Sequence, residues 1–140
     1  MGAVHTISKT LSANDTGETG AHQAGILVPK EEKILNFFPA LNTKEKNPRV
    51  HLVFTDDNGI KWEFAFIYYN NKFFGGTRNE FRLTRMTPFF RTHNLNQKDE
   101  LVLQKTSEGI RSVTYRRSKE TGLDERGVLK LTGGWKVISF

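Results

Sequence analysis

Residues 49–69 read RVHLVFTDDNGIKWEFAFIYY, and this stretch predicts the fold class. Every second side chain is apolar over residues 50–54 and again over residues 62–68, which is the period of a β-strand that faces a core. Between the two runs, Asp57-Asn58-Gly59 favours a tight turn because Asn and Gly tolerate positive φ. The stretch therefore predicts two antiparallel strands joined as a hairpin.

Shorter segments with strand character flank this hairpin on both sides. They are residues 25–28, 81–84, 100–105, 110–116, 127–131 and 135–140. One helix is predicted over Lys30 to Phe38, with Pro29 at its first position and Pro39 as its stop. Two polar connections, residues 12–20 and 42–48, are expected to be loops. Many short strands with one or two brief helices predict a mostly β barrel or sandwich.

The composition is that of one folded domain. The chain has 140 residues, of which 36% are hydrophobic and 11 are Phe, so residues 1–140 can surround a single core. Cysteine is absent, which excludes disulfides, thiolate metal sites and a cysteine nucleophile. No apolar run has the length of a membrane span, and residues 1–12 lack the order of a signal peptide. We expect a soluble, cytoplasmic protein with no membrane partner.

Positive charge is concentrated in two parts of the chain. The net charge is +6, yet residues 1–35 hold three Lys or Arg against four Asp or Glu. Residues 72–91 hold five basic side chains against one acid, and residues 105–130 hold seven against four. A localised basic field attracts polyanions, of which nucleic acid is the commonest. An ordinary solvated basic surface would have the same composition, so charge alone leaves both interpretations open.

The segment FGGTRNEFR, residues 74–82, carries the strongest signal for a binding site. Its two glycines allow a sharp turn or a close approach to a ligand. Arg78, Glu80 and Arg82 then recur at every second position, so in an extended chain they project from one face. Arg can donate two parallel hydrogen bonds to guanine O6 and N7, and Glu can accept one from cytosine N4. The pattern suits a G·C-rich major-groove edge, and a surface ion pair of little consequence is the alternative.

A polar, glycine-rich loop around His22 is a second candidate for contact with DNA. Its short polar side chains and exposed backbone amides could meet phosphates or base edges. The polar members are Asn14, Asp15, Thr16, Thr19, His22 and Gln23. A plain loop with a structural His is the alternative interpretation.

Motifs for catalysis or metal binding are weak. Glu31-x-Lys33, preceded by Asp15, has the spacing of a metal-dependent nuclease, although Glu31 falls in the predicted helix. The four His are too far apart for a zinc pair, and residues 17–20 lack the Lys of a phosphate-binding loop. A small Mg-dependent nuclease and a basic β-barrel protein-interaction module remain the alternatives to DNA recognition.

Two blocks of the sequence resemble a known family. Residues 11–25 (LSANDTGETGAHQAG) and residues 67–85 (IYYNNKFFGGTRNEFRLTR) are similar to the N-terminal effector-binding domain of EcoRII-type restriction endonucleases. The likeness runs from Lys9 to Arg85 and includes the region of the predicted helix. It implies an open DNA-binding pseudobarrel of seven to eight strands with one or two short helices, and residues 1–140 would form that single domain.

The resemblance also implies how DNA would be held. Two arms, Lys9 to Gln23 and Lys72 to Arg82, would clasp duplex DNA and read a short G·C-flanked site such as CC(A/T)GG through the major groove. Gly76 and Phe81 depart from the family pattern, which has lysines at both positions. Combined with the residue patterns, the resemblance gives these candidate DNA contacts: Lys9, Asn14, His22, Lys72, Arg78, Asn79, Glu80, Arg82 and Arg85.

The family resemblance implies a second domain beyond this chain. A recognition or effector domain of a type II restriction endonuclease would bind double-stranded DNA without a cofactor and would contain no catalytic residue. Cleavage, and the Mg²⁺ that it requires, would belong to a fused or associated nuclease domain. We therefore expect sequence-specific DNA binding without catalysis from residues 1–140.

Overall fold

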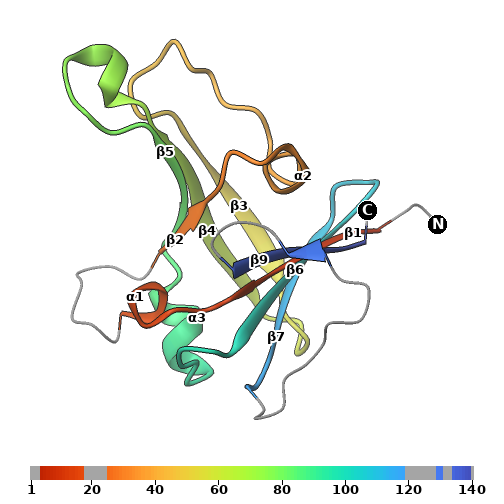
Figure 1. Ribbon diagram of the computed structural model, residues 1–140. Coiled ribbons are helices and arrows are strands. Elements are labelled where there is room, and N and C mark those ends of the chain that lie inside the picture. The colour runs from red at the N-terminus through yellow and green to blue at the C-terminus, as the bar shows by residue number, and fades with distance from the viewer. Residues whose placement is uncertain (1–3, 18–24, 119–128, 131–133, 140) are drawn as a thin grey trace.

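A computed structural model describes residues 4–17, 25–118, 129–130 and 134–139 of the chain. Across these segments, nine strands form one sheet in the order β2-β5-β4-β3-β7-β6-β1-β9-β8 (Figure 1). The strands are β1 Val4–Thr10, β2 Ile26–Val28, β3 Arg49–Thr55, β4 Lys61–Tyr69, β5 Glu80–Thr84, β6 Glu100–Thr106, β7 Arg111–Arg116, β8 Leu129–Lys130 and β9 Trp135–Ser139. The helices are α1 Ala13–Thr16, α2 Glu32–Leu35, α3 Thr87–Thr92 and the 3-10 helix η1 Asn71–Phe74.

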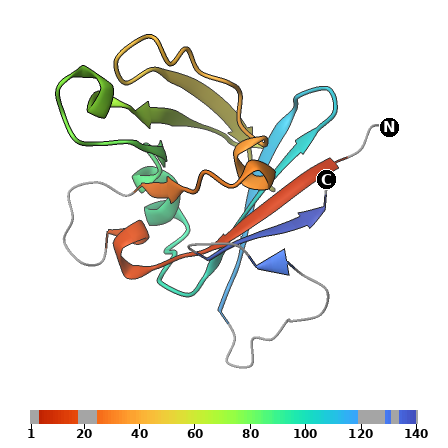
Figure 2. The ribbon, with the colours of Figure 1, turned by 45° about the horizontal axis from the view of Figure 1, so that its top comes forward.

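The sheet curls into an open barrel. Its neighbouring strands pair antiparallel except β3 and β7, which run parallel and meet where Thr55 pairs with Ser112. Figure 2 shows β2 and β9 on the same side of the curled sheet, although other strands separate them in the sheet order. The indole Nε1 of Trp135 donates to the carbonyl of Leu27 at 3.0 Å and joins β9 to β2. The mostly β, barrel-like architecture predicted from the sequence is confirmed.

The hairpin predicted from residues 49–69 forms as expected. β3 and β4 pair from Arg49 with Ile67 to Thr55 with Lys61, and Gly59 in the turn adopts a φ of 81°. Leu52 and Phe54 of β3 are buried against the interior, as alternation requires. The opposite face of the same strands therefore points away from the core.

An aromatic core fills the barrel. Phe38, from the turn after α2, stacks on Phe66 of β4 with ring centroids 4.4 Å apart. Phe81 of β5 stacks on Phe66 from another side at 5.6 Å, so this position faces the core. Trp135 and Phe54 are fully buried in the same cluster. Burial of aromatic side chains contributes most of the apolar area that stabilises such a small domain.

The numbers of strands and helices differ from the sequence-based prediction. Nine strands replace the expected seven to eight because β1 was not predicted. Three α helices and η1 replace the expected one or two helices. α1 lies inside the stretch predicted as a loop, and it forms because Ser12 and Asp15 make a reciprocal capping box. α3 begins at Thr87 with Pro88 in its first turn, a helix start that was not predicted from the strand-rich pattern.

The predicted helix between residues 30 and 38 is shorter than expected. α2 is a single turn that begins after Glu31, so Pro29 precedes the helix and is not at its first position. Ile34 and Phe38 are nevertheless buried, and Leu35 packs against the core, as the apolar spacing predicted. In the segments that the structure describes, no helix has the length and apolar character needed to cross a membrane.

Candidate nucleic-acid interface

The candidate interface lies on the outer face of the β2-β5-β4-β3 part of the sheet, the side that points away from the core. Register aligns Leu27 of β2, Arg82 of β5, Ile67 of β4 and Arg49 of β3 in one row across four strands. Leu27 and Arg49 are exposed, whereas Ile67 is buried within the row. The outer face thus presents two guanidinium groups beside an exposed apolar side chain.

Arg78, Glu80 and Arg82 form an ion-paired cluster on this face, called here the Arg–Glu–Arg triad. Arg78 Nη2 and Arg82 Nε both donate to Oε2 of Glu80, at 2.7 and 2.9 Å. The guanidinium of Arg78 also lies 3.8 Å above the ring of Tyr69, which pairs with Glu80 across the strands. The Arg78 guanidinium is therefore held in position from two directions, and the Arg82 guanidinium is held by Glu80.

The charge state of Glu80 follows from its two arginine partners. Partial burial alone would raise the pKa of this carboxyl group. The hydrogen bonds and charges of Arg78 and Arg82 outweigh that effect and hold the Glu80 pKa below its usual value. Glu80 is therefore ionised at neutral pH and can order both guanidinium groups.

The segment between β4 and β5, residues 70–79, forms a compact arm that includes η1 and extends beyond the sheet (Figure 1). The amide of Lys72 donates to the carbonyl of Arg78 at 2.9 Å, and the amide of Arg78 donates to Oδ1 of Asn71 at 2.7 Å. Gly75 ends η1 with a φ of 93°. A Cβ on Gly76 would lie 2.8 Å from Asn71 Cγ and Oδ1, so the Asn71 side chain would have to shift to admit one. The positive φ of Gly75 favours glycine at that position, as the sequence suggested.

Three further predicted contacts lie on or near this arm. The ammonium of Lys72 is exposed and makes no hydrogen bond or ion pair to any described residue. Asn79 accepts a hydrogen bond from the Tyr68 hydroxyl at 2.6 Å, so its side chain is bound to the sheet. Arg85 has a φ of 66° and lies 3.4 Å from His51 Nδ1 on the outer face.

The first predicted arm is only partly described. Lys9 in β1 is buried, and its Nζ donates to Asp15 at 2.7 Å and to the carbonyl of Thr10 at 2.9 Å. Its ammonium is thus engaged inside the protein rather than presented on the surface. Asn14 in α1 is exposed. The predicted contact at His22 lies outside the described residues.

The two arm regions lie on the same side of the barrel. In Figures 1 and 2, α1 and η1 are both at the left of the view, and β2 and β5 run between them. Among the predicted contacts, side-chain hydrogen bonds join Arg78, Glu80 and Arg82 directly to one another. Lys9 lies at the buried base of the α1 segment.

Three residues of the outer face were not predicted from the sequence. Arg49, His51 and Tyr69 share this face with the triad through strand register. His51 Nδ1 lies 2.9 Å from Glu63 as well as near Arg85. Their position on the outer face was predictable from the hairpin sequence, because these residues alternate with the apolar residues that face the core. Only the pairing of β4 with β5 connects them to the triad.

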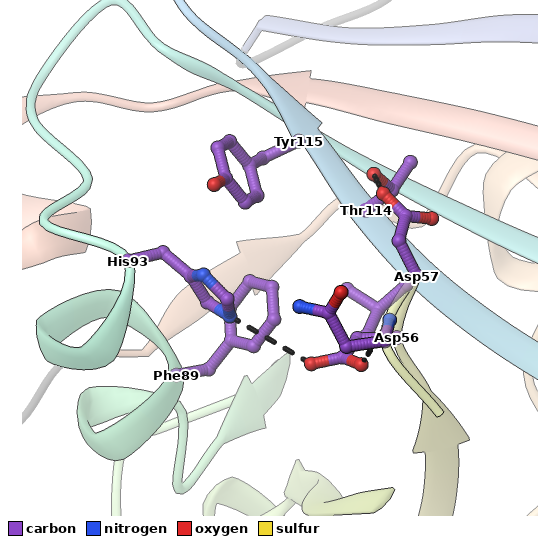
Figure 3. A pocket seen from close by; sticks show the side chains of 8 residues that line it. Asp56, Asp57, Phe89, His93, Thr114 and Tyr115 are labelled. Atoms are coloured by element: carbon purple, nitrogen blue, oxygen red, sulfur yellow. Dashed lines mark hydrogen bonds and ion pairs between the residues drawn. The ribbon is translucent and has the colours of Figure 1, made fainter. Parts of the chain in front are cut away.

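A polar pocket with a cavity of about 260 Å³ lies at the turn of the β3–β4 hairpin (Figure 3), at the end of the hairpin away from the triad. Asp56 at its edge accepts hydrogen bonds from the amides of Asn58 and Ile60 and from Trp62 Nε1. His93 Nε2 lies 3.8 Å from the same carboxylate, on its Oδ2 atom. Because both oxygens of Asp56 are already bonded, its principal role is to hold the hairpin turn.

The structure gives no support to a nuclease centre in the described segments. Asp15 is bound by Lys9 and by the amide of Ser12, and Glu31 is the exposed residue that precedes α2. Among the residues with defined positions, no group of three or more His, Asp or Glu side chains could hold a metal ion.

The fold is the one called a DNA-binding pseudobarrel. A solved structure described as the Arabidopsis FUS3-DNA complex matches with a TM-score of 0.61 and 19% identity, covering 80% of this chain and 96% of that chain. Residues 2–99 match the family described as "Restriction endonuclease EcoRII, N-terminal". The chain belongs to this family.

The chain is also similar in sequence to parts of two longer proteins. The type II restriction enzyme EcoRII of Escherichia coli is 48% identical over 82 residues, which is 55% of this chain. Auxin response factor 3 of Oryza sativa subsp. japonica is 29% identical over 117 residues, or 84% of this chain. The chain spans 20% of the length of the first relative and 15% of the second.

Proposed function

We propose that this chain recognises a short sequence in double-stranded DNA through the outer face of β5 and the arm before it. The observation that carries the proposal is the sharing of Glu80 Oε2 by Arg78 and Arg82 on an exposed face. Arginines fixed in this way lose less conformational freedom on binding than mobile ones would. A rigid, base-reading surface is the arrangement that sequence discrimination needs.

The free hydrogen-bonding atoms of the triad match a G·C pair. Arg78 uses one Nη atom and Arg82 uses Nε for Glu80, so each retains further N–H donors. Those donors can bind guanine O6 and N7. Glu80 Oε1 makes no hydrogen bond to any described residue and can accept from cytosine N4. A G·C-flanked target such as CC(A/T)GG therefore fits the chemistry of the triad.

Other residues would contact the DNA backbone or support the arms. The exposed cations of Lys72 and Arg85 lie beside the triad and would neutralise phosphates. Lys9 would anchor the first arm through Asp15. Asn14 and His22 in that arm, and Asn79 in the second, would add polar contacts to the clasp.

We further propose that the chain binds DNA without cutting it. The parent protein would be a type II restriction endonuclease, since the family is the N-terminal domain of such an enzyme. The nuclease domain, with its Mg²⁺, would lie elsewhere in that protein or in a partner. DNA binding would need no cofactor.

In vitro selection from a random duplex pool tests the proposal directly. We expect the chain to enrich one short motif with G·C pairs at its ends. Enrichment of no motif, together with equal affinity for acidic proteins, would favour a basic protein-interaction module instead. Incubation with plasmid and Mg²⁺ tests the nuclease alternative, and we expect the plasmid to stay intact.

A further inference from the structure

Three basic side chains lie in a row on the inner face of the sheet at one end of the barrel. His5 of β1 pairs with Lys105 of β6, and Lys105 pairs with Arg111 of β7. We call these three residues the cation row. They share a face with Ile7, Leu103 and Val113, which are fully or almost fully buried one step further along the strands. The row therefore lies where the hydrophobic core ends.

The described contacts of Lys105 are with a backbone carbonyl and an aromatic ring. Lys105 Nζ donates to the carbonyl of Phe37 at 2.7 Å and lies 5.3 Å from the buried Phe37 ring. In the part of the chain that the structure describes, neither Lys105 nor Arg111 forms an ion pair with a carboxylate. Arg111 Nε is buried and has no hydrogen-bond partner among these residues. Lys105 and Arg111 thus carry two positive charges without a carboxylate partner among the described residues, and Nε of Arg111 is in addition a buried donor without an acceptor.

The electrostatics of the row reflect this imbalance. Burial lowers the pKa of Lys105, and the charge of Arg111 lowers it further. Burial also lowers the pKa of Arg111. Like charges directly opposite each other in a sheet destabilise it, and a buried donor without a partner adds to that cost. An anion at this position would relieve both penalties at once.

We infer that the cation row is a binding site for a phosphate-class oxyanion. The ammonium of Lys105 and the guanidinium of Arg111 would supply the charge, and Arg111 Nε would gain the acceptor that it lacks. His5, next in the row, adds a ring nitrogen on the other side of Lys105. The carbonyl of Phe37 fixes the Lys105 stem, so the site is ordered before the ligand arrives.

This site is separate from the proposed DNA interface. The start of β1 and the β6–β7 turn lie at the right of Figures 1 and 2, whereas α1 and η1 lie at the left. A duplex held by the arms would therefore not cover the cation row. The anion could be free phosphate or the backbone phosphate of a second or strongly bent DNA segment, and the test must distinguish these sources.

Thermal unfolding of the full chain in phosphate tests the site. We compare phosphate with chloride at equal ionic strength and pH, for the wild type and for the variants Lys105→Met and Arg111→Met. The thermal midpoint of the wild type should rise by roughly 5–10 °C when the phosphate concentration is one hundred times the dissociation constant of the site. The increase should follow the logarithm of the phosphate concentration rather than the total salt concentration. Both variants should lose the phosphate-specific gain. Without phosphate, Arg111→Met should melt no lower than the wild type because a repulsion has been removed, whereas Lys105→Met also loses the hydrogen bond to the Phe37 carbonyl and should melt somewhat lower.

Lys61→Met is the matched control, because Lys61 is an exposed lysine at the start of β4. This variant should keep the full phosphate gain. Equal stabilisation of the wild type by phosphate and chloride would overturn the inference. Loss of the gain in Lys61→Met as large as in Lys105→Met would overturn it as well. If one of the two cation-row variants does not fold, the other variant and the comparison of phosphate with chloride in the wild type still test the site.

Duplex titrations against salt identify the source of the phosphate. If Lys105→Met lowers the slope of log affinity against log salt by about 0.9, DNA backbone phosphate occupies the site. An unchanged slope, with the phosphate gain abolished, identifies a free anion. The inference is independent of the proposed function, since the triad variants should alter DNA binding and leave the phosphate gain intact.

Discussion

The ammonium of Lys9 and the carboxylate of Asp15 meet at 2.7 Å inside the protein, with side-chain exposures of 8% and 11%. The same Asp15 oxygen accepts the amide of Ser12 and completes the cap of α1. One ion pair therefore ties β1 to the only described helix of the first arm. Lys9 therefore supports the first arm through Asp15 inside the protein.

Lys9→Met should destabilise the protein, because it leaves Asp15 buried without its cation. Removal of one partner from a buried pair typically costs about 3–5 kcal/mol, and the residual exposure and the Ser12 bond argue for the lower end. Chemical denaturation measures this loss. The double variant Lys9→Met/Asp15→Leu should recover part of it, since no charge is then left unpaired.

The same variants test whether Lys9 touches DNA. The slope of log affinity against log salt should be unchanged in Lys9→Met, because a buried ammonium displaces no counterion. A fall in that slope by about 0.9 would show instead that Lys9 contacts a phosphate.

Arg78→Ala should relax sequence choice at one base pair. Loss of a bidentate base contact costs about 1–3 kcal/mol of discrimination, and random DNA should be bound almost as before. Competition between the selected site and single-base variants measures the effect. Equal weakening on every sequence would remove Arg78 from the base-reading residues.

Lys72→Met should behave in the opposite way. Its free ammonium on η1 makes it a candidate for phosphate contact, so selected and random duplexes should weaken together. The salt slope should fall by about 0.9. If Lys72→Met changed base preference instead, phosphate contact would be the wrong role for it.

Gly76→Ala should damage DNA binding more than stability. The new Cβ would lie 2.8 Å from Asn71 Oδ1, and that oxygen also fixes the amide of Arg78. Displacement of Asn71 would loosen the arm and the position of Arg78. We expect at least a tenfold loss of affinity with a thermal midpoint close to that of the wild type. Gly109→Ala in the β6–β7 turn is the control, because its φ of 88° makes it costly for stability but not for DNA binding.

Local patterns predicted the parts of the fold that depend on local periodicity. The hairpin of residues 49–69 was predictable because alternation and turn chemistry agree within one stretch. The triad was predictable for the same reason, since Arg78, Glu80 and Arg82 are spaced at two residues in an extended segment that runs from the arm into β5. These features need no knowledge of distant partners.

Contacts between residues far apart in the chain could not be predicted from the sequence, because they depend on how the strands pair. Lys9 looked like a surface cation because its partner Asp15 is brought close only by the turn of α1. The cation row joins residues 5, 105 and 111 through the register of three strands. Arg49 reaches the triad only through two strand pairings. Such registers depend on tertiary packing rather than on nearby residues.

Asp56 gives the fold a defined sensitivity to acid. The hydrogen bond from Trp62 Nε1 is the main cause of a lowered Asp56 pKa, and the amides of Ile60 and Asn58 and the charge of His93 add to it, while burial opposes it. A carboxyl whose pKa is lowered by folding stabilises the protein above its unfolded pKa. That stability is lost as pH falls through the folded pKa.

Asp56→Asn should therefore be less stable than the wild type at neutral pH, and the difference should shrink below about pH 4. Denaturant unfolding at a series of pH values, followed by circular dichroism, measures both free energies of unfolding. Asp57→Asn is the matched control. Asp57 is exposed and its carboxylate accepts only the Thr114 hydroxyl from the described residues, so its loss should matter little at any pH. A difference between wild type and Asp56→Asn that persists unchanged to pH 2 would show that shape, rather than the charge of Asp56, holds the hairpin turn.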